Sequence, residues 1–535
     1  MARRDVRYGS TPPPLFSGWP EPAVISQTQC PTRLNPIPGG STFELAPRAQ
    51  TGHSSCMVMR HDVIVVGGGT AGCVLAARLS EDPACSVLLL EAGPDYPAAQ
   101  VPPDLLDGIH GPSIATHDWG LTGRFGRRVL PLPRGRVIGG SSAVNATFAL
   151  RGSPADYDAW QLPGWSFADV LPSFIRLESD LDFPAAAHHG AIGPVPIRRY
   201  RGAEESAVAA AASECLRAAG LPEIADHNAP NAVGVAPTPV NAVRGRRMST
   251  ALTHLEPARA RANLLIRGDA VVREIVLAGS RATGVRLADG EVIGAGEVIV
   301  SAGTYHSPGL LTRSGIDVPA VGVNLVDHPA VSVDLPYYGP VRDVALFQLV
   351  ATLHSSMANP ATDPPDLQIM VGGPFPPSDP ARPHVFFVGA ALLKPRSRGQ
   401  VRDHIDPNYY DDPGDLPRLV EAVDRVEDAI SGQAIRELSR GERLEPRIAD
   451  GAALHRWIKA RTWSYHHPVG TCAMGTVVDT DCRVYGVDGL SVVDASVMPD
   501  IPSANTNIPT IMIAEQVVAS RRAQRRQPAV AAEHR

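Results

Sequence analysis

An apolar run followed by regularly spaced glycines is the feature that most constrains how this chain can fold. Residues 62–66 (Asp-Val-Ile-Val-Val) have the β-branched composition of a strand that is buried on both faces of a parallel sheet. Gly67, Gly69 and Gly72 then follow the spacing G-x-G-x-x-G. In that spacing the first glycine permits a tight turn, the second lets a pyrophosphate approach the backbone, and the third lets the next helix pack closely.

The residues after the glycines predict the rest of a strand–helix–strand unit. We expect a helix from Ala71 to about Leu79, and its first amides, at Thr70 and Ala71, would point at the phosphates. A second strand is expected at residues 86–90 and ends in Glu91, nineteen residues after Gly72, where a carboxylate can accept hydrogen bonds from a ribose diol. A glycine-rich turn alone would be a weak signal. Strand, glycines, helix, strand and acid in register predict dinucleotide binding.

Length and composition exclude several other classes of protein. A chain of 535 residues is long enough for two domains and an additional segment. The net charge of -6 gives no electrostatic reason to expect a nucleic-acid partner. The longest apolar runs, 344–353 and 385–393, have about half the length of a transmembrane helix, so we expect no transmembrane segment and interpret them as strands or buried helix turns.

Cysteine usage bears on metals and on the compartment. The seven cysteines form no C-x-x-C pair and no His/Cys cluster with metal-ligand spacing, so no metal site is expected. An odd, scattered set of thiols fits a reducing compartment, which predicts a cytoplasmic protein. The cysteines are Cys30, Cys56, Cys73, Cys85, Cys215, Cys472 and Cys482.

The first 56 residues do not resemble a folded domain. They are rich in proline, show no sustained periodicity, and lack the apolar stretch that a secretory signal requires. Met57 and Met59 stand just before the first predicted strand. We therefore interpret residues 1–56 as a disordered leader or as the product of a mis-assigned start codon.

The middle of the chain alternates between helical and extended patterns. Helices are expected at 156–160, 166–174, 204–219 and 416–430, and strands at about 345–356, 366–371 and 385–393. Residues 263–300 have the pattern of an antiparallel meander with a turn at Asp289-Gly290, and the meander ends in a buried strand before Ser301-Ala302-Gly303.

Two polar groups near the C-terminus are candidates for catalysis. His466 and His467 precede Pro468 in a loop, and a histidine in such a loop can serve as a general base because its pKa lies near neutral pH. A strand over 490–495 ends at Asp494, and a helix is expected from Ile511, which places residues 505–508 at a second helix N-terminus. Without further context, a structural histidine and a capping asparagine explain the same pattern.

The ordered set of these motifs resembles the glucose–methanol–choline (GMC) oxidoreductase family. The resemblance extends from about residue 60 to 520. It implies an α/β fold with a discontinuous, Rossmann-type FAD-binding domain and a substrate domain built on an antiparallel sheet flanked by helices. It also implies oxidation of an alcohol by hydride transfer to the flavin N5. The matching segments are 62–72 with Glu91, 134–145 with 151–158, 303–315, 321–329, 467–475 and 492–515.

The family's motifs also imply roles for individual residues. His467, in the motif H-P-x-G-T, would remove the hydroxyl proton, although the adjacent His466 is an alternative that its spacing to Pro468 makes the weaker one. Asn505 would hold the substrate oxygen. The resemblance places Gly67, Gly69, Gly72 and Glu91 on the ADP moiety and Val272 by the adenine. It places Gly139, Gly140 and Asn145 along the pyrophosphate and flavin, and Asp494, Ala495, Asn507 and Ile508 near the ribityl chain and pyrimidine edge.

The expected domains follow from the same resemblance. Residues 57–150, 241–330 and 463–525 would form the FAD-binding domain, 151–240 and 331–462 the substrate domain, and 526–535 a tail. Covalently flavinylated members carry a histidine where this chain has Val144, so FAD is expected to be non-covalent and dissociable.

The resemblance leaves the substrate and the electron acceptor open. The substrate would be a small-molecule alcohol or a redox carrier, and the acceptor O2, a quinone or another carrier. Counted from Met59 the chain is compact for the family, as in the mycofactocin-associated branch, so one alternative is a dehydrogenase that oxidises a mycofactocinol and feeds electrons to respiration. A flavin-retaining lyase is the other alternative.

Overall fold

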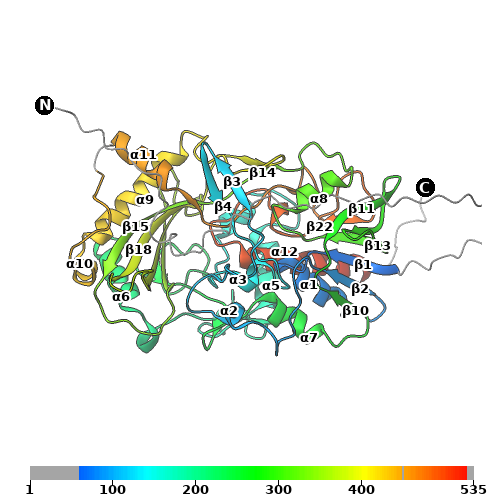
Figure 1. Cartoon of the computed structure of the whole chain (residues 1–535), viewed down its shortest axis with the longest axis horizontal. Coiled ribbons are helices and arrows are strands. Elements are labelled where there is room, and N and C mark those ends of the chain that lie inside the picture. Colours follow the sequence, from blue (N-terminus) through cyan, green and yellow to red (C-terminus); the bar gives the residue numbers. More distant parts are fainter. Residues whose placement is uncertain (1–59, 449–450, 527–535) are drawn as a thin grey trace, which may run out of the picture.

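The computed structural model describes residues 60–448 and 451–526 of the chain. The leader of residues 1–56 and the residues beyond 526 lie outside the described residues, so the prediction of a disordered leader or mis-assigned start stays untested. Figure 1 shows an elongated molecule with one large sheet towards each end and a long helix, α12 (Asn507–Arg526), extending from the middle into one half.

The N-terminal strand–helix–strand unit is built into a seven-stranded sheet. β1 pairs in parallel with β2 on one side and with β13 on the other, and α1 (Thr70–Leu79) follows β1 directly. The strand order is β10-β2-β1-β13-β12-β11, and β22 also pairs with β13. The strands are β1 (Arg60–Val66), β2 (Val87–Leu90), β10 (Leu264–Arg267), β11 (Val272–Ala278), β12 (Arg281–Leu287), β13 (Val292–Val300) and β22 (Leu490–Val492).

One part of the predicted meander was wrong. β11, β12 and β13 do form antiparallel hairpins, with Asp289-Gly290 in the second turn. β10, however, pairs in parallel with β2 at the edge of the Rossmann-type sheet, with Leu264 opposite Val87. Its sequence, Leu-Leu-Ile-Arg, has the apolar composition common to both kinds of strand, so its pairing depends on tertiary packing.

All strand pairs of the second large sheet are antiparallel, and its order is β21-β15-β18-β17-β16-β7. One face packs on α6 (Ala207–Ala218) and α9 (Asp415–Ile430), and this contact forms a separate hydrophobic core (Figure 1). The other face contributes to the cavity described below. Its strands are β7 (Gly234–Pro237), β15 (Pro329–Tyr337), β16 (Leu349–Leu353), β17 (Leu367–Phe375), β18 (His384–Leu392) and β21 (Trp463–Ser464).

Three further sheets among the described residues are smaller. The five-stranded sheet comprises β3 (Thr122–Phe125), β4 (Arg128–Pro131), β14 (Val323–Leu325), β19 (Gly399–Val401) and β20 (Ile405–Asp406). The two-stranded sheets are β5 (Glu178–Asp180) with β6 (Val195–Ile197), and β8 (Ala242–Val243) with β9 (Arg246–Arg247). The hairpin β3–β4 was absent from the sequence prediction.

Most helices lie close to their expected positions. The remaining α-helices are α2 (Pro103–Leu106), α3 (Ser141–Val144), α4 (Pro154–Asp158), α5 (Phe167–Leu177), α6 (Ala207–Ala218), α7 (Glu256–Ala258), α8 (Ser307–Arg313), α9 (Asp415–Ile430), α10 (Gln433–Ser439) and α11 (Gly451–Arg461). Short 3-10 turns occupy Gly202–Glu204 and Ala495–Val497, and a π-helical turn occupies Ala251–Leu255. Within the described ranges, no helix combines the length and apolar composition needed to cross a bilayer.

The architecture confirms the expected fold class: a Rossmann-type parallel unit together with an antiparallel sheet flanked by helices. The proposed domain boundaries stay a prediction. The five cysteines within the described ranges, from Cys73 to Cys482, are buried.

Candidate active site

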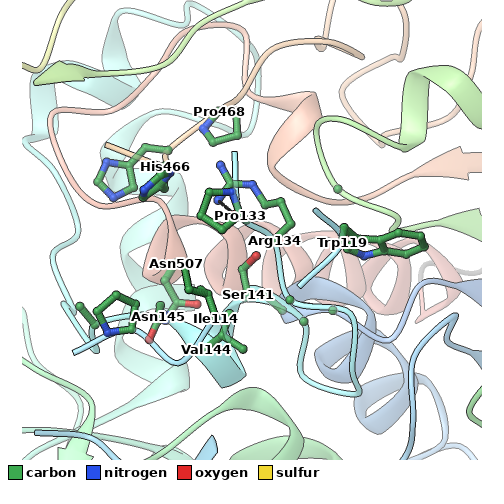
Figure 2. A pocket seen from close by; sticks show the side chains of 18 of the residues that line it. Ile114, Trp119, Pro133, Arg134, Ser141, Val144, Asn145, His466, Pro468 and Asn507 are labelled. Carbon is green, nitrogen blue, oxygen red and sulfur yellow. Dashed lines mark hydrogen bonds between the residues drawn. The ribbon is translucent and has the colours of Figure 1, made fainter. Parts of the chain in front are cut away.

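A cavity of about 890 Å³ extends from the glycine-rich turn after β1 to the face of the antiparallel sheet. In Figure 2, Arg134, His466 and Pro468 border one side of it, and Ile114, Val144 and Asn145 border the opposite side. Of the residues predicted to bind the cofactor, Gly67, Gly69, Thr70, Ala71, Glu91, Gly140, Asn145, Val272, Asp494, Ala495 and Asn507 line this cavity. Both predicted catalytic residues, His467 and Asn505, also line it.

Gly72 and Gly67 shape the turn between β1 and α1 by close packing. A Cβ on Gly72 would lie 1.9 Å from the carbonyl oxygen of Gly67, and Gly67 itself has a φ of +100°. Gly72 therefore acts through helix–strand packing and does not line the cavity. Cys73 donates the first backbone hydrogen bond of the helix, to Gly69, so the amides of residues 70–72 are the free donors of a helix N-terminus.

The loop at Gly139 and Gly140 packs directly against the glycine-rich turn after β1. Gly140 has a φ of +51°, and a Cβ there would lie 2.6 Å from the Cα of Gly69. The amide of Gly139 donates to the carbonyl of Gly68 over 2.7 Å, which ties the two loops together although Gly139 does not line the cavity. Two backbone segments approach each other here without side chains between them, which leaves room for an extended ligand along both.

Glu91 ends β2 beside the same loops. Its carboxylate accepts the backbone amides of Gly68 at 2.8 Å and Gly93 at 2.9 Å. Burial raises the pKa of Glu91 to about 7, although these amides favour the charged form and partly offset the effect. A ligand hydroxyl that donates to this carboxylate would stabilise its charge further.

Asp494 and Asn507 lie where β22 and α12 reach the cavity. Asp494 accepts hydrogen bonds from the amide of Gly303 at 2.8 Å and from the hydroxyl of Ser307 at 2.6 Å. Asn507 is different, because both its Oδ1 and its Nδ2 are buried without a hydrogen-bond partner among the described residues. Ile508, next to it on α12, is buried in the core and does not line the cavity.

These unpaired atoms test whether the cavity suits a flavin. Leaving a buried polar group unsatisfied costs about 1–3 kcal/mol. The donor Nδ2 and the acceptor Oδ1 of Asn507, in the cavity lining, therefore call for a ligand with both an acceptor and a donor. The pyrimidine edge of a flavin has alternating donors and acceptors. Together with the glycine loops, the helix N-terminus and Glu91, Asn507 gives FAD a complementary set of contacts.

His467 is held from both sides of its ring. Its Nε2 lies 3.0 Å from Nδ2 of Asn505, and its Nδ1 lies 3.0 Å from Nδ1 of His328. The backbone amide of His467 donates to Oδ1 of Asp327 at 2.8 Å. Because these contacts come from segments distant in sequence, the imidazole is fixed by the tertiary structure.

The electrostatics of the site keep its histidines neutral. Burial lowers the pKa of His467 well below its ordinary value, and His328, His466 and Arg134 lower it further. The pKa of His466 falls to about 3, mainly through burial and also through Arg134. Nη1 of Arg134 donates to the Pro133 carbonyl, whereas its Nη2 is buried without a hydrogen-bond partner in the described part of the chain.

His466 differs from His467 in its contacts. It has a φ of +67°, and its backbone amide donates to the hydroxyl of Ser464 at 3.0 Å. Its Nδ1 has no hydrogen-bond partner within residues 60–448 and 451–526, and neither His328 nor Asn505 orients its ring. Both histidines line the cavity, but only His467 pairs with the other predicted catalytic residue.

Sequence reasoning missed two participants. His328 and Arg134 lie in segments that carried the resemblance, but no role was assigned to either. His328 is separated from His467 by 139 residues, and no periodicity could have predicted that contact. Arg134 precedes the glycine loop that was predicted to hold the cofactor, and a basic residue at that place was the available signal.

Comparisons with known proteins identify the family of the chain. Two sequence models of GMC oxidoreductases match the chain, over residues 61–330 and 395–514. The 5-(hydroxymethyl)furfural oxidase of Methylovorus sp. (strain MP688) is 34% identical over 524 residues, which cover 85% of this chain and 97% of that protein. An oxygen-dependent choline dehydrogenase of Brucella anthropi is 32% identical over 529 residues, covering 86% and 95% respectively.

A solved structure shares the whole fold. The crystal structure of pyridoxine 4-oxidase from Mesorbium loti superposes with a TM-score of 0.79 at 29% identity, and the match covers 86% of this chain and 99% of that one. The fold of this chain thus occurs in a family of FAD-dependent alcohol oxidases and dehydrogenases. The chain belongs to the GMC oxidoreductase family and is an FAD-dependent oxidoreductase acting on CH–OH groups.

Proposed function

We propose that this enzyme oxidises a small-molecule alcohol, with His467 as the base that accepts the hydroxyl proton. The observation that carries the proposal is the convergence of His467 Nε2 and the Asn505 amide, 3.0 Å apart, on one point of the cavity wall. An alcohol that enters between the two groups, in place of their mutual contact, can donate to His467 Nε2 while it accepts from Asn505 Nδ2.

The partners of His467 favour the tautomer that a base needs. A short contact between two Nδ1 atoms requires one donor and one acceptor. If His467 carries its proton on Nδ1 and this N–H donates a hydrogen bond to Nδ1 of His328, Nε2 of His467 keeps a lone pair towards Asn505. That assignment agrees with Asn505 Nδ2 as the donor to Nε2, and the lowered pKa of His467 keeps the ring neutral before reaction.

The cofactor contacts form the second part of the proposal. The α1 N-terminus and the Gly69–Gly140 loops would hold the pyrophosphate, Glu91 the ribose of the ADP moiety, and Asn507 the pyrimidine edge. Val272 would lie by the adenine. Bound FAD supplies the acceptor for the hydride of the alcohol carbon. Val144, which lines the cavity, has no nucleophilic atom, so we propose that FAD is held non-covalently.

A matched pair of variants tests the assignment of the base. With a reducing alcohol under anaerobic conditions, His467→Ala should keep its FAD but lose at least ~100-fold in the rate of flavin reduction. His466→Ala removes an imidazole from the same cavity without breaking the Asn505 contact, and should lose less than about 10-fold. Stopped-flow absorbance measures both. The opposite order, with His466→Ala as the slow variant, would transfer the role to His466.

The alternative functions differ in what happens to the flavin. A mycofactocinol dehydrogenase would be reduced by its carrier but hardly by free alcohols, and a lyase would show no net reduction. Compact length no longer favours the first alternative, because the furfural oxidase relative matches over 97% of its own length. Rapid reoxidation of the reduced enzyme in air would assign O2 as acceptor, and slow reoxidation would assign another carrier.

A further inference from the structure

Six aromatic side chains line one part of the cavity, on the side of the antiparallel sheet. Four of the chain's 11 phenylalanines are among them, which is a strong concentration of a rare residue type. They come from the segment after Asn145, from the residues before β16, from β17 and β18, and from β21 and the residue after it. This aromatic box consists of Phe148, Phe347, Phe375, Phe387, Trp463 and Tyr465.

The rings of the box pack on one another around Phe347. Its centroid lies 5.8 Å from that of Phe148, 5.8 Å from that of Phe375 and 6.1 Å from that of Phe387. The rings of Phe375 and Phe387 are nearly parallel, at 7°. Gly372 makes room for them, because a Cβ there would lie 2.6 Å from Phe387 and 2.8 Å from Phe347. The box is therefore a packed structure with defined ring orientations.

The box continues to the catalytic histidine. The ring of Tyr465 lies 4.4 Å from that of His467, and Trp463 packs edge-on against Tyr465 at 5.7 Å. Ala504, which precedes Asn505, belongs to the same hydrophobic cluster as Phe148 and Phe387. A substrate whose hydroxyl reaches His467 and Asn505 would thus place the rest of its body against aromatic faces and edges.

The charges around the cavity discriminate between aromatic substrates and cations. Aromatic rings alone would also suit an ammonium group. Among the described residues that line the cavity, however, the only carboxylates are Glu91 and Asp494, and both accept hydrogen bonds from backbone amides near the glycine loops. Asp327, which accepts the backbone amide of His467, does not line the cavity. Among the described lining residues, the charged side chain that lowers the pKa of His467 is Arg134, and its guanidinium disfavours a second positive charge.

We propose that the substrate is an aromatic primary alcohol, a hydroxymethyl group on a flat ring that carries no positive charge, bound with its ring in the aromatic box. The inference rests on the proposed function, since it places the hydroxymethyl group at His467. Ring packing in edge-to-face or offset geometry contributes about 0.5–1.5 kcal/mol per pair beyond the area buried, which corresponds to a ~2- to 10-fold preference over a saturated ring of the same size.

Two pairs of alcohols test the substrate class with the FAD-loaded enzyme. Benzyl alcohol should have a kcat/KM for flavin reduction at least ~2-fold above that of cyclohexylmethanol, whose ring is saturated. The 4-(hydroxymethyl)benzoate anion should be preferred to the 4-(hydroxymethyl)phenyl-trimethylammonium cation, because the two differ in charge on the same ring. Equal values for benzyl alcohol and cyclohexylmethanol, or a preference for the cation, would overturn the inference.

Two adjacent phenylalanines on β18 provide a matched pair of variants. Phe387 lines the cavity, whereas Phe386 points to the opposite face of the sheet and belongs to the core beneath α6 and α9. Phe387→Leu should reduce the benzyl-to-cyclohexylmethanol ratio about 2- to 10-fold. Phe386→Leu loses the same ring from a buried site and should leave the ratio unchanged. An equal change in both variants would mean that the ratio reports packing of the sheet, and would contradict the role of the box.

The same experiment separates this inference from the proposed function. If cyclohexylmethanol and benzyl alcohol reduce the flavin equally well, alcohol oxidation stands and only the substrate class fails. If no alcohol in the set reduces the flavin, both fail together.

Discussion

At the scale of single residues, the chemistry depends on how one imidazole is held. His467 was identified from its place before Pro468, and Asn505 from a family motif, and the structure brings these two side chains within 3.0 Å. The tautomer of His467, by contrast, depends on His328, which approaches it from a segment 139 residues away. Such contacts arise from packing and have no local sequence signal.

His328 offers a prediction about positioning. His328→Ala removes the acceptor for His467 Nδ1, so the base is no longer fixed in one tautomer and kcat should fall at least ~10-fold with little change in KM. His328→Gln retains a carbonyl acceptor and should recover part of the loss. Steady-state kinetics as a function of pH measures both. A loss of FAD in His328→Ala, or an equal loss of kcat in His328→Gln, would show that the residue only supports packing.

At the scale of elements, local signals predicted the strand–helix–strand unit well. β1, α1 and β2 lie within two residues of their expected bounds, because the glycines and the apolar runs determine them locally. α12 begins at Asn507, four residues before the predicted start at Ile511. Pro509 lies in the first turn of α12, where a proline is tolerated because its missing amide proton would have no partner. The parallel pairing of β10 had no local signal at all.

The carboxylate of Glu91, which follows β2, predicts that FAD binding depends on pH. The pKa of Glu91 is raised to about 7 in the free site, and ribose hydroxyls that donate to its carboxylate would lower that pKa. FAD binding then releases a proton, so the affinity should rise with pH up to about 7 and fall below it. Titration of the apoprotein with FAD on either side of that pH measures the effect.

Glu91→Gln should weaken FAD binding about 10- to 100-fold above pH ~7 and abolish the pH dependence, because a charged acceptor is replaced by a neutral one. Asp95→Asn is a suitable control, since Asp95 pairs with Arg259 and does not line the cavity. An unchanged affinity in Glu91→Gln would remove Glu91 from the ribose contact.

At the scale of the whole molecule, one cavity joins two halves with different tasks. The Rossmann-type sheet supplies the glycine loops and the carboxylate, and the antiparallel sheet supplies the aromatic box (Figure 1). The catalytic pair comes from the segments that connect them, after β21 and before α12. The family resemblance implied an FAD-binding domain and a substrate domain, and this division stays a prediction. The ring orientations of the box could not be predicted, because they depend on side chains from five separate segments.

The central claim is that this cavity holds a flavin which an alcohol reduces. The most direct measurement is an absorbance spectrum of the FAD-loaded enzyme under anaerobic conditions, before and after addition of benzyl alcohol. The account predicts loss of the oxidised-flavin band on addition of the alcohol. A flavin that stays oxidised with benzyl alcohol and with every other primary or secondary alcohol tested would contradict it.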